Sequence, residues 1–348
     1  MGGSMRRLIA RLTITAAAIF LCVTAASAMP EGMISEQDRK ASVTKDFDQK
    51  LQVFADPVPL NEDDLSQSSL GQLKYIQGWS LTSDHHQFGG FSTFLKTQRG
   101  IISVSDLGLW LQASFDADAE EPFSNATLTW QVPRKYDNDM KKVTDIESVL
   151  KLPYGYLVGY EQFHRFEQVT EPGGWAFTSD ISSAVDFRGL TPNGGVEAMT
   201  WFGGNSILAF AERAKDIKGR LKAWILKSDR TSDNLWFKPP QNFYPTDAKT
   251  LPSGDILVLL RRFSLVEGAG AKLQRIPAET ILPGATLVGE DVATLESPIT
   301  VDNMEGLDIE VLADGRVRLY LMSDNNLSRL QRTLLMIFDY APDGVTPK

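Results

Sequence analysis

The sequence predicts an all-β fold, a single β-propeller of five or six four-stranded blades. Five times along the chain a hydrophilic residue stands 14 to 19 positions ahead of a charged one, with a two-strand pattern between them. The first members of these pairs follow at intervals of 55, 50, 50 and 58 residues. Four short strands with their turns fill about that length, so the period predicts a radial repeat. The pairs are Ser92/Asp106, Glu147/Glu161, Glu197/Glu212, Asp247/Arg261 and Glu305/Asp324.

The strands themselves are legible from residue 70 onward. Short runs such as GIISVSD, YLVGYE, SILAFAE, DILVLLRR and VRLYLMSD are rich in β-branched, aromatic and aliphatic residues. Turn signals such as Pro252-Ser253-Gly254 separate them. Evenly spaced short strands are typical of a sandwich, a barrel or a propeller, and the fifty-residue period favours the propeller.

One strand remains after the last repeat, at Thr333–Tyr340. We expect it to pair with Leu73–Leu81 and close the ring with strands from both ends of the chain, because an open ring would expose strand edges. Five blades account for the five legible copies. A sixth would have to be a degenerate blade in the ends or in the interval 261–305.

The N-terminal part divides into two segments before the propeller. Residues 1–28 contain Arg6, Arg7 and Arg11, an apolar run from Leu12 to Val23, and Ala26-Ser27-Ala28. This pattern predicts a cleaved signal peptide and a periplasmic protein with no membrane span after cleavage, because so short an apolar run cannot cross a bilayer. Residues 29–68 read as a polar, extended or loosely docked lead-in that could contain one strand, and residues 69–343 as the propeller domain.

Charge and composition exclude several classes of function. The chain has 35 Lys and Arg against 44 Asp and Glu, and the signal peptide holds three of the arginines and none of the acids. This acidic balance argues against nucleic acids and anionic lipid surfaces as partners and is compatible with cation binding. Cys22 is the only cysteine and would leave with the signal peptide. Serine-esterase, P-loop, dinucleotide and zinc-protease motifs are missing from the sequence.

The repeated pairs also predict a site. In each copy the first member starts one strand and the second ends the next, so antiparallel pairing brings both to the same end of a hairpin. Repeated around a propeller, these positions would line one mouth of the central channel. Clustered carboxylates suit Ca²⁺ or another divalent cation. The predicted metal ligands are Glu147, Glu161, Glu305, Asp324 and Asp106.

Four residues are candidates for catalysis. Glu197 and Glu212 belong to the third copy, and Arg261 is the one positive charge in the series, suited to a phosphate or carboxylate group. His164 follows Glu161 by three residues and is the best general acid or base by residue type. The alternative is that the same charged residues form structural salt bridges between blades.

Several long segments carry a family resemblance. The stretches DNMEGLDIEVLADGRVRLYLMSDNNLSRLQRTLLMIFDY (302–340), GGVEAMTW…AFAER (194–213) and LPSGDILVLLRRFS (251–264) resemble the proteins called "esterase-like activity of phytase", or phytase-like domain proteins. The resemblance covers about residues 70–342 and implies an exported, propeller-like domain. Two functions are compatible with it: a metal-assisted hydrolase of phosphate or carboxylic esters, or a non-catalytic periplasmic binding or scaffold propeller.

Overall fold

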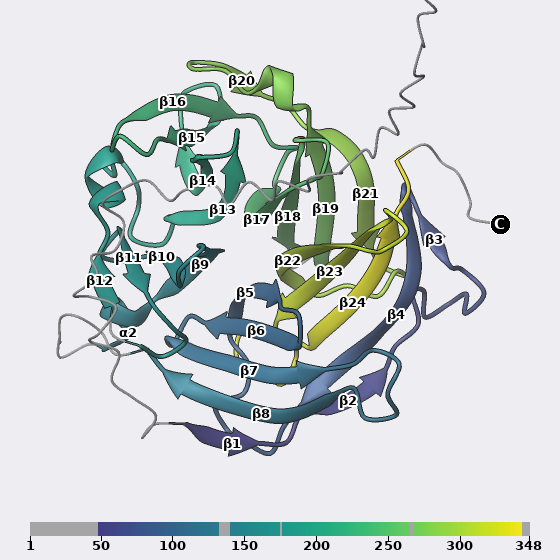
Figure 1. Ribbon diagram of the computed structural model, residues 1–348. Coiled ribbons are helices and arrows are strands. Elements are labelled where there is room, and N and C mark those ends of the chain that lie inside the picture. The colour runs from purple at the N-terminus through teal and green to yellow at the C-terminus, as the bar shows by residue number, and fades with distance from the viewer. Residues whose placement is uncertain (1–47, 132–139, 175, 265–267, 343–348) are drawn as a thin grey trace, which may run out of the picture.

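The computed structural model describes residues 48–131, 140–174, 176–264 and 268–342. Five antiparallel sheets stand around a central axis, so the fold is a five-bladed β-propeller (Figure 1). The predicted signal peptide (1–28) and residues 29–47 of the predicted lead-in lie outside the described residues. Within the described ranges, no helix is long and apolar enough to cross a membrane.

Each blade takes its innermost strand first and builds outward. Blade 1 contains β5 (Phe91–Lys96), β6 (Gly100–Ser105), β7 (Leu109–Phe115) and β8 (Phe123–Trp130). Blade 2 contains β9 (Ile146–Lys151), β10 (Tyr156–Tyr160), β11 (Arg165–Val169) and β12 (Ala176–Thr178). Blade 3 contains β13 (Val196–Phe202), β14 (Ser206–Lys215), β15 (Leu221–Leu226) and β16 (Ser232–Phe237), with β20 (Thr286–Leu287) added in parallel at its edge.

The last two blades complete the circle. Blade 4 contains β17 (Tyr244–Thr250), β18 (Ile256–Ser264), β19 (Gly268–Ile276) and β21 (Glu290–Glu296). Blade 5 contains β22 (Asn303–Val311), β23 (Val317–Asp324), β24 (Thr333–Tyr340) and β4 (Leu73–Thr82). Short helical turns lie between strands at α2 (Met140–Thr144), η1 (Asp180–Ala184) and η2 (Ala278–Thr280). The innermost strands of neighbouring blades contact one another around the whole ring, and the apolar cores lie between the sheets.

The predicted closure of the ring is confirmed. Strand β24 pairs antiparallel with β4, from Thr333 opposite Leu81 to Tyr340 opposite Leu73. The fourth strand of blade 5 therefore comes from the start of the described chain and its first three from the end. Because all five sheets are accounted for in this way, the six-blade alternative is wrong.

Residues 48–68 are more ordered than a loose lead-in. Strand β1 (Gln49–Leu51) pairs with β8 on the outside of blade 1, and β2 (Phe54–Pro57) pairs with β4 on the outside of blade 5. The short strand β3 (Ser69–Leu70) also pairs with β4. The segment thus supplies two edge strands where one at most was expected. Its polar composition is that of edge strands, which are largely exposed.

Strand β24, which closes the ring, should contribute strongly to the stability of the folded protein. Leu334 on β24 is fully buried, whereas Leu330, four residues earlier, is 95% exposed. We expect Leu334→Ala to lower the free energy of unfolding by about 2–5 kcal/mol because it leaves a cavity in the core, and Leu330→Ala to change it by less than about 0.5 kcal/mol. Urea denaturation of the two variants measures the difference, and equal effects would contradict the closure described above.

Candidate functional site

The repeat visible in the sequence is a repeat of β-bulges. In every innermost strand the antiparallel register skips one residue near the start of the strand, which leaves that residue unpaired with the next strand. A bulge re-aims a side chain, and here the repeated bulges surround the central axis. The skipped residues are Ser92, Glu147, Glu197, Thr246 and Glu305.

The fourth copy corrects the sequence interpretation by one residue. Asp247 is paired with Leu259, and Thr246 is the skipped residue. Asp247 is buried instead between blades, where its Oδ1 pairs with Lys249 Nζ (2.8 Å) and its Oδ2 accepts from the Leu307 N–H (2.9 Å). Its place in the repeat was therefore wrong, and its role is structural.

The second members of the pairs are equivalent to one another. Each lies opposite the residue two positions before the bulge. The backbone N–H groups of Asp106, Glu161 and Glu212 donate to the carbonyls of Gly90, Asp145 and Gly195, and Arg261 and Asp324 are registered with Tyr244 and Asn303. First and second members therefore meet at the same end of every inner hairpin, as predicted.

Together these positions enclose a polar cavity of about 220 Å³ at one mouth of the channel. Eight of the nine predicted site residues line it: Asp106, Glu147, Glu161, Glu197, Glu212, Arg261, Glu305 and Asp324. Ser92, Asp145, Gln162, Asn193, Arg213 and Asn326 complete the lining. The cavity thus gathers eight carboxyl groups and two guanidinium groups.

His164 is not among the residues that line this cavity, although its ring lies beside Gly195 next to Glu161. Its Nε2 donates to the Thr191 carbonyl at 3.0 Å, and its ring stacks with Phe187 at 6.1 Å between centroids. The reason is local: Glu161 lies beyond the end of β10, and the chain turns before His164. Strand alternation therefore no longer sets the direction of its side chain.

Sequence reasoning missed Asp145. It stands two residues before the bulge at Glu147, and its carbonyl accepts the N–H of Glu161. The signal was present in the spacing Asp145-x-Glu147, because residues two apart in a strand share a face. Gln162 and Asn193 come from loops and carried no such signal.

One side of the cavity is neutralised by arginine. Arg261 on β18 places Nη2 at 3.2 Å from Glu212 Oε1 and Nε at 2.8 Å from Glu305 Oε1. Its neighbour Arg262 turns away and pairs with Glu296 at 3.1 Å. Arg213, with a half-exposed side chain, places Nε at 2.6 Å from Glu212 Oε2. Arg261 therefore connects blade 4 to blades 3 and 5.

The acids of the cavity also lie close to one another. Oxygen atoms of Glu161, Glu197 and Glu212 lie within 4.8 Å of one another, and so do those of Asp145, Glu147 and Glu161. Glu161 belongs to both triads. Its Oε1 accepts the N–H of Gly195 at 2.8 Å, which fixes its position.

Burial and mutual repulsion raise the pKa of several acids in the cavity. Burial raises the pKa of Glu161 to about 7, and burial together with Glu147 and Glu212 raises the pKa of Glu197 well above its ordinary value. Burial raises the pKa of Glu305 to about 8 even though Arg261 opposes the shift. Burial raises the pKa of Asp324 to about 6. Carboxyl groups packed this closely either keep protons or share a cation.

The donor set fits a divalent metal ion. All of the candidate ligand atoms in the two triads are carboxylate oxygens, the ligands that Ca²⁺ and Mg²⁺ prefer. Ion binding would exchange protons for metal–oxygen contacts at the triad members whose pKa is raised, Glu147, Glu161 and Glu197. The buried acid cluster can therefore hold a metal ion, although its geometry does not select one element.

Fold and site together define a five-bladed propeller whose channel mouth is lined with acids. The chain belongs to the phytase-like family described as "Esterase-like activity of phytase", whose profile matches residues 86–327. The resemblance inferred from the sequence is thereby confirmed.

Several solved structures align with this chain at low identity. A gluconolactonase from Xanthomonas campestris aligns over 86% of this chain and 99% of its own, with 8% identity and a TM-score of 0.39. A glycosyl hydrolase from Bacteroides ovatus aligns over 84% and 96%, with 10% identity and a TM-score of 0.40. A β-propeller domain from Myceliophteria thermophila aligns over 82% and 99%, with 9% identity and a TM-score of 0.36. No protein of curated function matches the sequence.

Proposed function

We propose that this protein is an exported, periplasmic hydrolase of phosphate or carboxylic esters that binds Ca²⁺ or another divalent cation at the acidic channel mouth. The observation that carries the proposal is the pair of carboxylate triads that share Glu161. The description of the family as esterase-like supports the hydrolytic part.

The residues divide into two sets by position. Glu161, with Asp145 and Glu147, would hold the cation, which leaves Glu197 for proton transfer. A bound divalent cation supplies Lewis-acid polarisation of an ester oxygen. The half-exposed Arg213 faces the same cavity and is suited to an anionic oxygen of the substrate. Arg261, already paired with two glutamates, holds Glu212 and Glu305 in place.

A buried carboxyl group of the cavity would donate the proton that the leaving group needs. Because burial and the neighbouring acids raise the pKa of Glu197, its carboxyl group is suited to give a proton to the leaving oxygen as the ester bond breaks. Water contributes the new bond to phosphorus or carbon, and its proton passes to a neighbouring carboxylate of the cavity. The cavity of about 220 Å³ is below the usual size of a whole-ligand pocket, so the reacting phosphate or acyl group would enter it and the rest of the substrate would stay outside.

Turnover of 4-nitrophenyl phosphate and 4-nitrophenyl acetate tests this proposal. Activity should require Ca²⁺, Mg²⁺ or Mn²⁺ and disappear in EDTA. We expect Glu197→Gln, which keeps the shape of the side chain but cannot donate an acid proton, to lower kcat/KM by about 10²–10⁴-fold. The exposed Glu121→Gln is the matched control and should leave kcat/KM unchanged. Metal-independent turnover, or full activity of Glu197→Gln, would exclude the proposed mechanism.

A specific observation favours a second candidate, a non-catalytic binding or scaffold propeller. Arg261 ties together three blades through Glu212 and Glu305, and Glu161 accepts a backbone N–H from blade 3. Contacts of this kind join neighbouring blades and stabilise the propeller without any need for catalysis. In that case the purified protein would show no turnover, Ca²⁺ would not change its melting temperature, and Glu305→Gln would lower that temperature by removing one ion pair.

A further inference from the structure

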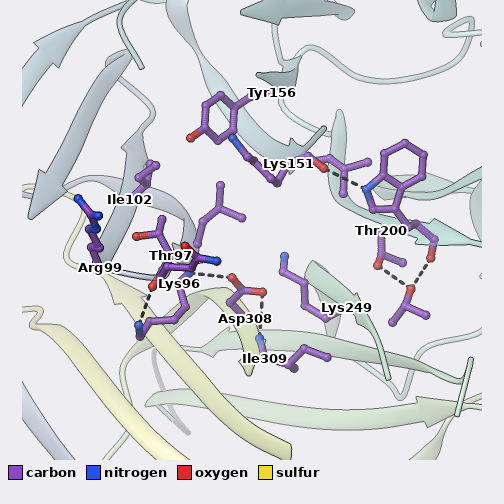
Figure 2. A pocket seen from close by; sticks show the side chains of 15 residues that line it. Lys96, Thr97, Arg99, Ile102, Lys151, Tyr156, Thr200, Lys249, Asp308 and Ile309 are labelled. Atoms are coloured by element: carbon purple, nitrogen blue, oxygen red, sulfur yellow. Dashed lines mark hydrogen bonds between the residues drawn. The ribbon is translucent and has the colours of Figure 1, made fainter. Parts of the chain in front are cut away.

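A second cavity, of about 760 Å³, lies where the inner strands run into their hairpin turns, and Figure 2 shows it from close by. Its lining comes from the far ends of the inner hairpins of blades 1 to 5, around Lys96, Lys151, Trp201, Thr250 and Ile309. The acidic cavity lies at the opposite ends of the same hairpins. The propeller therefore has two different mouths.

The interior of this second cavity is apolar. Leu95, Ile102 and Leu150 are buried and contribute side chains to its lining, and Ile309 is half-buried beside them. The indole of Trp201 is held by a hydrogen bond from its Nε1 to the Lys151 carbonyl (3.0 Å). A volume of this size, lined by apolar and aromatic groups with a few polar ones, is typical of a small-molecule site.

Four cationic side chains share this lining: Lys96, Arg99, Lys151 and Lys249. Lys249 projects between Asp308 and Thr200 and is already paired with Asp247 at 2.8 Å. Lys96 donates from Nζ to the Thr97 carbonyl (2.7 Å), whereas neither Arg99 nor Lys151 forms a salt bridge with any residue in the described ranges. The Lys151 ammonium lies 4.0 Å from the centroid of the Tyr156 ring, and burial lowers its pKa. This cation is partly desolvated and lacks an acidic partner.

The one acid of this lining does not neutralise the two exposed cations. Asp308 accepts the backbone N–H groups of Lys96 (2.7 Å) and Ile309 (2.9 Å), which satisfies both of its oxygens. Arg99 and Lys151 would repel a cationic ligand. A neutral ligand could fill the apolar interior but would form no ion pair with these two residues. The combination favours an anion attached to an apolar body.

We propose that this cavity is a second binding site, specific for small organic anions. The carboxylate, sulfonate or phosphate group of the ligand would lie against Arg99 and Lys151, and its apolar body would pack on Leu95, Leu150 and Trp201. This site is independent of the proposed hydrolytic site, since the two share no lining residue.

Calorimetric titration of the full chain in EDTA tests the site, with 2-naphthoate as the probe and 2-naphthamide as its neutral counterpart of the same shape. We expect naphthoate to bind at least tenfold more tightly than the amide, and its affinity to fall as salt is added. The double substitution of Arg99→Gln with Lys151→Met should weaken naphthoate binding by about tenfold or more. Both side chains are exposed, so this variant should fold, which its thermal melting curve checks.

The control is Lys218→Met, an exposed lysine outside the cavity. It should bind naphthoate as the wild type does. The proposal is overturned if naphthoate does not bind at millimolar concentration, if the amide binds equally well, if the double variant keeps wild-type affinity, or if Lys218→Met weakens binding as much. EDTA keeps divalent cations out of the measurement, so failure here leaves the hydrolase proposal standing, and the reverse also holds.

Discussion

In EDTA, the melting temperature of this protein should fall as the pH rises from about 5 to about 8. Glu161, Glu305 and Asp324 have pKa values of about 7, 8 and 6, all above those of an unfolded chain. Between the unfolded and folded values the native state binds more protons than the unfolded state, so stability is lost as the pH rises. Their contribution is complete below about pH 4 and gone above about pH 8.

The expected effect is large. Each unit of pKa shift is worth about 1.4 kcal/mol, so these groups together account for several kcal/mol, out of about 5–15 kcal/mol for a typical domain. A fall of about 5–10 °C follows for a chain of this size. Acids with lowered pKa, such as Asp186 and Asp216, titrate in the opposite sense but at lower pH. Differential scanning calorimetry across the pH range measures the slope.

Calcium should reverse this loss at the upper end of the range. A cation binds the ionised carboxylates, so at pH 8 and a concentration of 100 times Kd it adds about 2.7 kcal/mol to the stability of the native state. Glu161→Gln should abolish the gain, because Glu161 belongs to both triads and its amide oxygen can still accept from Gly195. The exposed Glu121→Gln should retain it. A melting temperature that is flat or rising with pH in EDTA would mean that the acids remain ionised without a cation.

The sequence was sufficient to predict the architecture and most of the acidic cavity, because both depend on the same periodicity. A bulge residue and the residue that ends the next strand recur in every blade, so their spacing is the spacing of the blades. The spacing alone therefore predicts that Glu147 and Glu161 lie at one mouth of the channel. The pairing of the last strand with Leu73–Leu81 followed from counting strands per period.

What could not be predicted depends on single-residue register and on turns. Thr246 and Asp247 are adjacent and polar, and only the hydrogen-bond register shows that Thr246 is the bulge. His164 follows a turn, where no strand periodicity fixes the side chain. The second cavity was invisible for a similar reason: Arg99, Lys151 and Trp201 come from three blades, with no common motif around them. Chemistry that is not repeated leaves no periodic signal.

Arg261→Met is expected to destabilise the protein by about 3–5 kcal/mol, because it leaves the buried Glu305 without its positive partner and Glu212 with Arg213 alone. Arg262→Met is the matched control from the next position on β18. Its partner Glu296 is 44% exposed, so its loss should cost about 1 kcal/mol or less. Urea denaturation of both variants at pH 8 gives the comparison, and equal losses would show that Arg261 does not neutralise the cavity.

The cost of losing Arg261 should itself depend on pH. At about pH 5 Glu305 is protonated in the native state, since its pKa is about 8, and a neutral carboxyl group needs no positive partner. The destabilisation by Arg261→Met should therefore shrink at about pH 5 relative to pH 8. Adding Glu305→Gln to Arg261→Met should recover part of the stability at pH 8, because it removes the carboxylate that has lost its positive partner. If the double variant were no more stable than Arg261→Met alone, the arginine would be acting through packing rather than charge, and the acidic mouth would have no need of a cation to replace it.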